Sequence, residues 1–397
     1  MSAVSPAVSA TAFAFAPVAP DNGFRQPDYW TWCPSIIRAP DTLMGEGGEG
    51  RMRWHMFASR WPKWLPFHPG WMVASEVVRA VADRAEGPYE FAEVVLPARG
   101  AEYWDGRSTH NPTIRYHGGH YWLFYMGSTH PFADFTPGSA GELGAGHPAC
   151  IVARSMKRVG VAWADSVCGP WHRLDEPVLP TKPGTFYSFL TSNPAPWIHD
   201  DGRVTMLFKA RAWMEGIRGP THGPMSIGLA EADEPGGLYR VFSDDNGPLF
   251  SPGPPVRFGE VEDPFLWQEG GRDGRGGVFR MIAKDMTGRL CGQAHAGFLA
   301  ESMPVAGGKP LVWRPGTPPL AYRRELVYTD GTRRMVGSME RPFVYFRNGH
   351  PAYFCAAVSN GKNGFSDATE TWNVVLPLVS GETSGLASGE PETRLRL

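Results

Sequence analysis

The fold is decided by residues 105–127, which read DGRSTHNPTIRYHGGHYWLFYMG. A polar cluster leads into Asn111-Pro112 and a short apolar run. Gly118-Gly119 follows, and then the aromatic run from His120 to Met126. Glycine is favoured in tight turns because it accepts positive φ without a steric cost. The stretch therefore predicts a β-hairpin with polar groups at the entry of its first strand.

This arrangement recurs along the whole chain, and each copy carries a proline at the strand entry. The entry dipeptides are Cys33-Pro34, Asn111-Pro112, Asn193-Pro194, Asp263-Pro264 and Arg341-Pro342. Consecutive prolines are 78, 82, 70 and 78 residues apart. Proline is tolerated at the first residue of a strand because its missing N–H need not join the ladder. We therefore expect an inner strand to begin near each of these prolines.

A second repeat interleaves with the first. An alternating apolar run ends in an aspartate, and an aromatic residue follows six positions later. The pairs are Asp83 and Tyr89, Asp165 and Trp171, and Asp233 and Tyr239, with a weaker copy at residues 296–301. Each unit thus contains two strands, a third alternating strand, a turn and a short outer strand. Five such units predict an all-β, single-domain, five-bladed β-propeller.

The two ends of the chain are predicted to lie outside the propeller. Residues 1–22 carry no charge before Asp21, and they lack the basic start and continuous apolar core of a secretory signal. We expect them to form a disordered leader. The propeller is expected to span residues 23–380, with the run TWNVVLPLV from Thr371 as a strand that closes the ring. Residues 381–397 are expected to form a polar tail.

Composition restricts the partners and the compartment. The net charge is −2 without a basic run, which argues against nucleic acid as a partner. No apolar run approaches membrane-spanning length, which argues against a membrane protein. The five cysteines are scattered and contain no CxxC pair. They are expected to be reduced thiols, which favours the cytoplasm, with a periplasmic or secreted location as the alternative.

Three further segments are candidates for contacts around a site. Residues 51–64, RMRWHMFASRWPKW, either contact a sugar or polyanion or form an inner strand followed by a surface loop. Residues 138–148 and 213–224 are predicted insertions without regular structure. Loops on a rigid scaffold often carry specificity, and the first insertion is long enough to cover a site as a flap.

Polar side chains at the entries of the inner strands should converge on the propeller axis. Clustered charges are costly to desolvate unless they serve a function. Paired carboxylates are what cleavage of a glycosidic bond requires, because one protonates the leaving oxygen and the other activates water or attacks carbon. A neighbouring cation can hold one carboxylate ionised, while burial keeps its partner protonated. The candidates at and between the entries are Cys33, Asp105, Arg107, His110, Asn111, Ser192, Asn193, Lys209, Arg211, Glu262, Asp263, Lys284, Asp285, His295, Glu340 and Arg341.

The sequence resembles the five-bladed propeller glycosidases, a superfamily that includes glycoside hydrolase families 43, 32, 117 and 130. The segments that carry the resemblance are WDGRSTHNPTI, TSNPAPWI, VEDPFLW, KDMTG, CGQAHAG and SMERPF, within residues 30–378. The resemblance implies hydrolysis of a glycosidic bond in an axial pocket, or phosphorolysis as in family 130, with a carbohydrate substrate and no required cofactor. Family 43 members often hold a calcium ion near the axis beside a histidine, a role that His295 would fill here.

The chain departs from the family 43 pattern at three entries. Those enzymes carry an aspartate base, an aspartate modulator and a glutamate acid at the first three blades, where this chain has Cys33, Asn111 and Asn193. The resemblance therefore points to a divergent branch that has relocated its catalytic groups or has lost the hydrolytic reaction.

The remaining acidic groups define the predicted site. A catalytic carboxylate pair is expected from Asp105, Glu262, Asp263 and Glu340. Glu262 and Asp263 are adjacent, so only one of them can face the pocket unless the strand is bulged. The expected substrate-binding residues are His110, Asn111, Asn193, Lys209, Lys284, Arg341 and His295.

Two other functions are compatible with the same pattern. One is a lyase or phosphorylase, in which Lys209, Arg211 and His110 would bind an anion. The other is a non-catalytic sugar-binding propeller. Carboxylates that point into blade interfaces rather than into a shared pocket would favour the non-catalytic protein.

Overall fold

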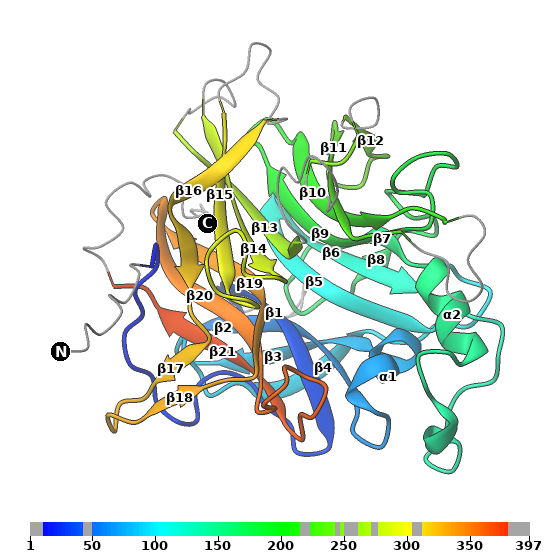
Figure 1. Cartoon of the computed structure of the whole chain (residues 1–397), viewed down its shortest axis with the longest axis horizontal. Helices are drawn as coiled ribbons and strands as arrows, with labels where there is room; N and C mark the ends of the chain where they lie inside the picture. Colours follow the sequence, from blue (N-terminus) through cyan, green and yellow to red (C-terminus); the bar gives the residue numbers. More distant parts are fainter. Residues whose placement is uncertain are drawn as a thin grey trace, which may run out of the picture.

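The predicted units form five antiparallel sheets around a common axis in a computed structural model (Figure 1). The structure describes residues 11–42, 50–214, 223–242, 247–249, 261–270, 277–303 and 312–379. Each sheet is one blade, and the innermost strands of consecutive blades contact one another around the ring, including the first and the fifth. The expected all-β, five-bladed β-propeller is confirmed.

Four blades have four strands, and the fifth has three strands of its own. Chain order runs from the axis outward, as the repeats predicted. The blades are β1(Tyr29–Pro40), β2(Met52–Pro62), β3(Glu76–Ala82) and β4(Glu90–Leu96); β5(Ser108–His117), β6(His120–Ser128), β7(Arg158–Ala164) and β8(His172–Arg173); β9(Leu190–Ile198), β10(Val204–Arg211), β11(Ser226–Ala232) and β12(Arg240–Val241); β13(Val261–Glu269), β14(Val278–Asp285), β15(Gly297–Ser302) and β16(Trp313–Tyr322); and β19(Ser338–Arg347), β20(His350–Ser359) and β21(Thr371–Pro377). A hairpin of β17(Glu325–Val327) and β18(Arg333–Met335) follows the fourth blade.

Each inner strand is bulged at its entry dipeptide. The residue before the proline has positive φ in every blade: Cys33 at 57°, Asn111 at 58°, Asn193 at 50°, Asp263 at 59° and Arg341 at 58°. The pairing register with the second strand shifts at the same place in all five blades. We expected the inner strands to begin near the prolines, but they begin a few residues earlier. For example, β5 already starts at Ser108, four residues before Pro112. The proline is accommodated at the bulge, where the ladder is interrupted and no N–H is required.

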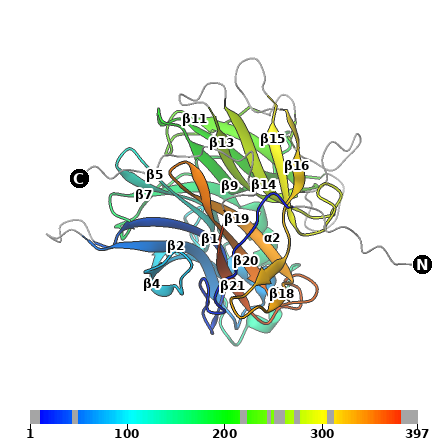
Figure 2. The same cartoon turned by 90° about the vertical axis from the view of Figure 1, so that its left-hand side faces the viewer.

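The segment at residues 11–24 packs along the last blades (Figure 2). Its backbone N–H groups donate from Ala12 to Leu320 at 2.8 Å and from Val18 to Val327 at 3.0 Å. Phe24 exchanges two backbone hydrogen bonds with Asn373 of β21, at 2.9 and 2.8 Å. The prediction of a disordered leader is therefore wrong for residues 11–22, because their backbone groups bond to the fourth and fifth blades. Residues 1–10 and the predicted tail at 381–397 lie outside the described residues.

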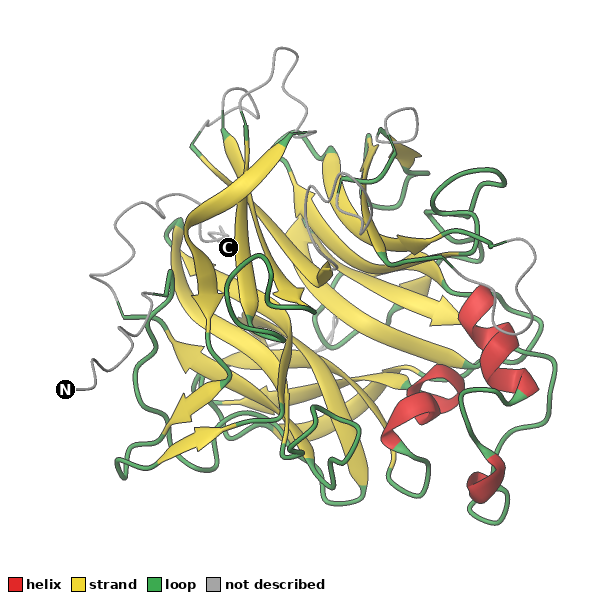
Figure 3. Cartoon of the chain, in the orientation of Figure 1, coloured by secondary structure: helices red, strands yellow, loops and turns green. Residues whose placement is uncertain are grey.

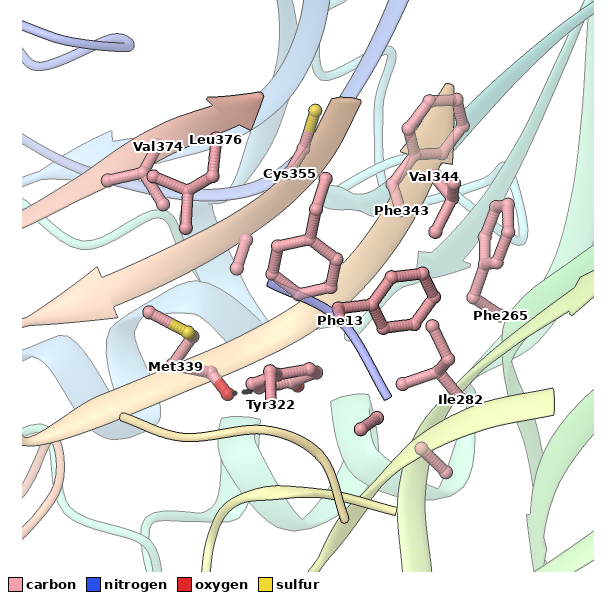
Figure 4. Packing of buried hydrophobic residues seen from close by; sticks show 14 of the residues in the cluster. Phe13, Phe265, Ile282, Tyr322, Met339, Phe343, Val344, Cys355, Val374 and Leu376 are labelled. Atoms are coloured by element: carbon pink, nitrogen blue, oxygen red, sulfur yellow. Dashed lines mark hydrogen bonds between the residues drawn. The ribbon is translucent and has the colours of Figure 1, made fainter. Parts of the chain in front are cut away.

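The hydrophobic core fills the spaces between neighbouring blades. Figure 4 shows the part between the fourth and fifth blades, where Ile282 and Tyr322 face Phe343 and Val344. Phe13 lies among these side chains and is only 2% exposed. The Tyr322 hydroxyl donates to the backbone oxygen of Met339 at 3.3 Å. The amino-terminal segment is thus part of the core.

Two short helices flank one end of the axis (Figure 3). They are α1(Phe67–Ala74), after the second strand of the first blade, and α2(Pro148–Ser155), after the insertion in the second blade, and they contact each other. The insertion at 138–148 also contains the single turn η1(Ala140–Glu142), so it is more structured than we predicted. His147 caps α2, because its Nδ1 accepts from the Ala149 N–H at 3.1 Å. Among the described helices, none is sufficiently long and apolar to span a membrane.

Candidate active site

A cavity of about 260 Å³ opens beside the two helices, at one end of the propeller axis. Its volume lies just below the usual range of roughly 300–1,000 Å³ for ligand sites. Inner strands, second strands and both helical regions contribute to its wall. The lining residues are Trp32, Trp61, Phe67, His68, Trp71, His110, Arg154, Lys157, Leu190, Lys209, Arg211, Glu262, Glu340, Arg341 and Phe365.

One side of the cavity is aromatic. Phe67 lies at the centre of this side, with ring centroids 4.9 Å from Trp32, 5.1 Å from Trp61 and 5.1 Å from Phe365. Trp71 continues the surface and stacks on His110 at 4.9 Å. Ligand sites are mostly apolar with a few placed polar groups. This side offers flat apolar surface to the carbon-bound hydrogens of a sugar ring.

Glu262 lies on the polar side and is held by Lys209 of the preceding blade. Lys209 Nζ donates to Glu262 Oε1, and both side chains are largely buried. Burial opposes ionisation of Glu262, but the charges of Lys209, Lys284 and Arg341 outweigh it and lower its pKa. Glu262 is therefore an anion at neutral pH.

Glu340 forms a second ion pair between blades. Lys284 Nζ of the fourth blade donates to Glu340 Oε1 of the fifth, and Glu340 is 4% exposed. Burial lowers the pKa of Lys284, but the charges of Glu340, Glu262 and Asp263 outweigh burial and raise it. Lys284 is not among the lining residues of the cavity, so it supports Glu340 from behind.

The five entry residues form a hydrogen-bonded chain around the axis. We call Cys33, Asn111, Asn193, Asp263 and Arg341 the axial ring. Cys33 Sγ donates to Asn111 Oδ1 at 3.0 Å, and Asn111 Nδ2 donates to Asn193 Oδ1 at 2.8 Å. Asn193 Nδ2 and Arg341 Nη1 both contact Asp263 Oδ1, at 2.7 and 2.5 Å. The ring and its prolines border a separate space of about 40 Å³.

The bulge separates the two adjacent acids of β13. Glu262 lines the cavity, whereas Asp263 belongs to the axial ring. Burial raises the pKa of Asp263 to about 7, Arg341 opposes this effect, and the charges of Glu262 and Glu340 add to it. Asn111 and Asn193, predicted to bind substrate, hydrogen-bond within the ring, and only Arg341 of the ring reaches the cavity.

The remaining polar wall is basic. Arg154 of α2, Lys157 just after it and Arg211 of β10 all line the cavity. Lys157 is 5% exposed, and its Nζ lies 3.9 Å from the centroid of the Trp71 ring. Burial lowers the pKa of Lys157 well below its ordinary value, and the charges of Lys209 and Arg154 lower it further.

The two histidines of the cavity are neutral. Burial lowers the pKa of His110 well below its ordinary value, and the charges of Arg341 and Lys157 act in the same direction. One ring nitrogen of His110, Nδ1, lies 2.8 Å from Ser75 Oγ. Burial and the charges of Arg154 and Lys157 lower the pKa of His68 to about 4.

The structure places Asp105 outside the cavity. It is completely buried in the second blade, where it accepts from Arg99 at 2.6 Å, from Arg173 at 3.4 Å and from Tyr125 at 2.7 Å. Its two oxygens are thus used in a structural network. Contrary to our prediction, Asp105 does not line the cavity with the other acids, and its carboxylate is instead engaged by these three groups.

His295 also lies apart from the cavity wall. Its neighbours include the cations Lys284 and Arg324, besides Glu340 and Asp285. Calcium prefers six to eight oxygen ligands. Among the described residues, no group of three or more His, Cys, Asp or Glu side chains is arranged for a metal ion. The residues around His295 therefore do not fit calcium.

Sequence reasoning missed about half of the wall. Arg154 and Lys157 come from the helical insertion, and Phe67, His68 and Trp71 come from α1. The basic and aromatic segment at 51–64 was one available signal. It forms a strand, β2, but this is the second strand of the first blade and not the inner strand that the structural alternative predicted. Its Trp61 lines the cavity. The closely spaced Arg154, Lys157 and Arg158 were a second signal.

The architecture is shared with solved glycoside hydrolases at low sequence identity. No protein-family model and no curated protein matches the sequence. The chain is similar to a family 117 glycoside hydrolase of the marine bacterium Zobellia galactanivorans, with a TM-score of 0.54, 15% identity, and coverage of 92% of this chain and 89% of that chain. It is also similar to a family 43 β-xylosidase/α-arabinofuranosidase from a compost microbial metagenome, with a TM-score of 0.52, 15% identity, and coverage of 96% and 98%.

A third solved structure, described only as a glycoside hydrolase, has a TM-score of 0.55, 13% identity, and coverage of 96% of both chains. At these identities the likeness shows the fold. The scaffold is the five-bladed propeller of these glycosidases, as the sequence motifs predicted.

Proposed function

We propose that this chain is a glycoside hydrolase that cleaves a small or terminal sugar unit in the cavity, with Glu262 and Glu340 as its catalytic carboxyl groups. The observation that carries the proposal is the presence of both carboxyl groups in one small cavity at the propeller axis. They come from adjacent blades, and each is held in place by a lysine. A merely structural pair would not need to line a cavity.

The electrostatics of Glu262 support different roles for the two carboxyl groups. Glu262 stays ionised because three cations lower its pKa, so it acts as the base that activates water or as the nucleophile. Glu340 is then the proton donor to the leaving oxygen. Lys284 Nζ donates a hydrogen bond to Glu340 Oε1 and holds this carboxyl group in place.

The shape of the cavity supports a small substrate. A space of about 260 Å³ with an aromatic side accommodates one sugar ring against Phe67 and the tryptophans. His110 and Arg341 also line the cavity, and in this proposal they bind sugar hydroxyl groups.

The proposal is tested by screening the protein against a panel of nitrophenyl and alkyl glycosides. Two isosteric variants of the protein are then assayed on the glycosides that it hydrolyses. Glu262→Gln and Glu340→Gln should each lower kcat by about 10²- to 10⁴-fold. The loss in Glu340→Gln should be smaller on nitrophenyl glycosides, because a good leaving group needs no proton. Glu262→Gln should show no such difference between the two kinds of leaving group.

A matched control is available in the same strand. Glu269 is a buried glutamate of β13 that pairs with Arg280 at 2.6 Å, and it does not line the cavity. Glu269→Gln should therefore keep its turnover. Near-native turnover in both Glu262→Gln and Glu340→Gln would reject the assignment. A folded protein that binds sugars but cleaves none of them would establish the non-catalytic alternative.

One observation favours a second reaction, cleavage by β-elimination. Burial and the neighbouring cations lower the pKa of Lys157. Its ammonium group is therefore easier to deprotonate than an ordinary lysine, and the deprotonated amine is the form that acts as a base. In this reaction the base removes the proton next to a sugar carboxylate, the bond to the leaving oxygen breaks, a double bond forms, and the leaving oxygen takes up a proton. An ultraviolet-absorbing unsaturated product that disappears in Lys157→Met would establish elimination instead of hydrolysis.

A further inference from the structure

The cavity contains more positive than negative side chains. Arg154, Lys157, Lys209, Arg211 and Arg341 line it, against the two glutamates. Lys209 is engaged by Glu262, and Arg341 by Asp263 of the axial ring. Lys284, outside the wall, already engages Glu340. The two glutamates of the cavity are thus held by Lys209 and Lys284, and Arg154, Lys157 and Arg211 form a basic wall beside them. Arg211 Nη1 donates to the backbone oxygen of Gly223 at 2.8 Å.

Lys157 is the centre of this basic wall. Only 5% of its surface is exposed to solvent. Among the residues that the structure describes, its ammonium group has no hydrogen bond or ion pair, and its contact is with the face of Trp71 at 3.9 Å. Burying an ammonium group without an acceptor is costly, and a cation–π contact returns only part of that cost.

The cations of the wall also act on one another. The charge of Arg211 lowers the pKa of Arg154, after the effect of burial, and the charge of Arg154 lowers the pKa of Lys157. They therefore share one region of positive potential inside the cavity. An anion bound there would relieve this repulsion and would receive charge-assisted hydrogen bonds, for which guanidinium groups match carboxylate and sulfate oxygens well.

We propose that the sugar bound in this cavity carries an anionic substituent, a carboxylate or a sulfate ester, and that Lys157, Arg154 and Arg211 bind it. This inference rests on the proposed function, and it names the substrate class. The aromatic side then holds the sugar ring, and the anionic group lies against the basic wall beside Trp71. Glu262 and Glu340 remain available for the glycosidic bond.

The inference is tested by binding rather than by turnover. Calorimetry and thermal shift are measured with D-glucuronate, D-galacturonate and a galactose sulfate ester, and with D-glucose and D-galactose as neutral counterparts. A hydrogen bond to a charged group contributes enough for the anionic sugars to bind roughly tenfold to a hundredfold more tightly. The uronate and sulfate arms identify which anionic group the wall prefers.

The variants distinguish the basic wall from a general effect of charge. Lys157→Met should remove the preference for the anionic sugars, and Lys157→Arg should restore it. Lys63→Met is a matched control, because Lys63 also lies over a tryptophan, with its Nζ 5.5 Å from the Trp30 ring centroid, but it does not line the cavity. If Lys157→Met does not fold, Arg154→Gln serves in its place and should weaken the preference.

The outcomes separate this inference from the proposed function. Glu262→Gln should lose turnover and keep the preference for anionic sugars. Turnover that persists in Glu262→Gln and Glu340→Gln, with the preference intact, would reject the catalytic assignment alone. Equal binding of neutral and anionic sugars, no binding of any anionic sugar, or an unchanged preference in both Lys157→Met and Arg154→Gln would overturn the anionic substrate.

Discussion

The cavity and the axial ring are built from neighbouring residues of the same strands, yet their polar groups are used in opposite ways. The ring residues Asn111, Asn193 and Asp263 hydrogen-bond to one another. The residues one position earlier, His110 and Glu262 among them, face the cavity. The left-handed residue at each bulge makes this possible, because two consecutive side chains then lie at different levels near the axis.

The difference shows where function is expected in such an assembly. A polar group that is satisfied by its neighbours has a structural role, and replacing it should change stability more than chemistry. A polar group that faces an open space beside other charges has groups to offer to a ligand. Stability and activity should therefore respond separately to substitutions in the two regions.

Replacement of Arg341 should have the largest effect on stability and activity together, because Arg341 belongs to both the axial ring and the cavity wall. Arg341→Met leaves Asp263 buried without its cation, which typically costs about 3–5 kcal/mol of unfolding free energy. It should also lower kcat/KM. Urea unfolding and steady-state kinetics measure the two effects. Arg280→Met, which breaks a buried pair with Glu269 away from the cavity, should destabilise the protein without changing kcat/KM. A loss of activity in Arg280→Met equal to that in Arg341→Met would contradict the separation.

Replacement of Lys209 should have the second-largest effect, which should appear in the pH dependence of activity. Lys209 is among the cations that keep the pKa of Glu262 low, so Lys209→Met should raise that pKa by about 1–3 units. Because Glu262 must be ionised to act, activity is lost as pH falls through its pKa. The acid limb of the kcat/KM profile should therefore move to higher pH. An acid limb that stays at the wild-type position would show that Glu262 is not the group that must be ionised.

Asn193 should change stability and leave the chemistry nearly unchanged. It accepts from Asn111 and donates to Asp263, so Asn193→Ala leaves buried partners unsatisfied, at a cost of about 1–3 kcal/mol. Thermal unfolding measures the loss, and kcat/KM should remain close to that of the wild type. A large fall in kcat/KM with unchanged stability would place Asn193 in the substrate site, as the sequence first suggested.

Cys33 should give the smallest effect. Burial raises the pKa of its thiol to about 12, so the group is a neutral donor to Asn111. Cys33→Ser keeps a donor at this place and should change the unfolding free energy by less than about 1 kcal/mol. The folded protein should also resist thiol-alkylating reagents at this position, as measured by mass spectrometry. Rapid alkylation of Cys33 in the folded state would show that the ring is open.

The sequence was most informative where the signal was local. The prolines of the entry dipeptides and the aspartate–aromatic spacing are periodic, and they predicted five blades and the third strand of the first four units. Turn and strand chemistry act over a few residues, so a repeated local pattern identifies a repeated local structure. The convergence of Glu262 and Glu340 followed from the ring geometry alone.

The failures of sequence reasoning share one cause, which is contact between distant residues. Residues 11–22 resemble a leader because their partners, including Leu320 and Val327, are more than three hundred positions away. Asp105 resembled a catalytic acid because its pairing with Arg99 and Arg173 depends on how the second blade closes. Lys157 was overlooked because it follows α2, which lies in an insertion of one blade. This insertion is not part of the repeated pattern, so the repeat could not indicate that Lys157 lies at the cavity.

The hydrogen bonds between Phe24 and Asn373 tie the first described strand-like segment to the last blade, and this has a consequence for how the protein is made. Residues 11–24 leave the ribosome about three hundred positions before their partners, which include Leu320, Val327 and Asn373. The apolar side chains of this segment, including Phe13, therefore have no native surface to cover them during that interval. Contacts of such long sequence separation form slowly, since the chain must first close a large loop. We expect completion of the circle to be a late event in folding, and chaperones that shield exposed apolar segments to act on this one.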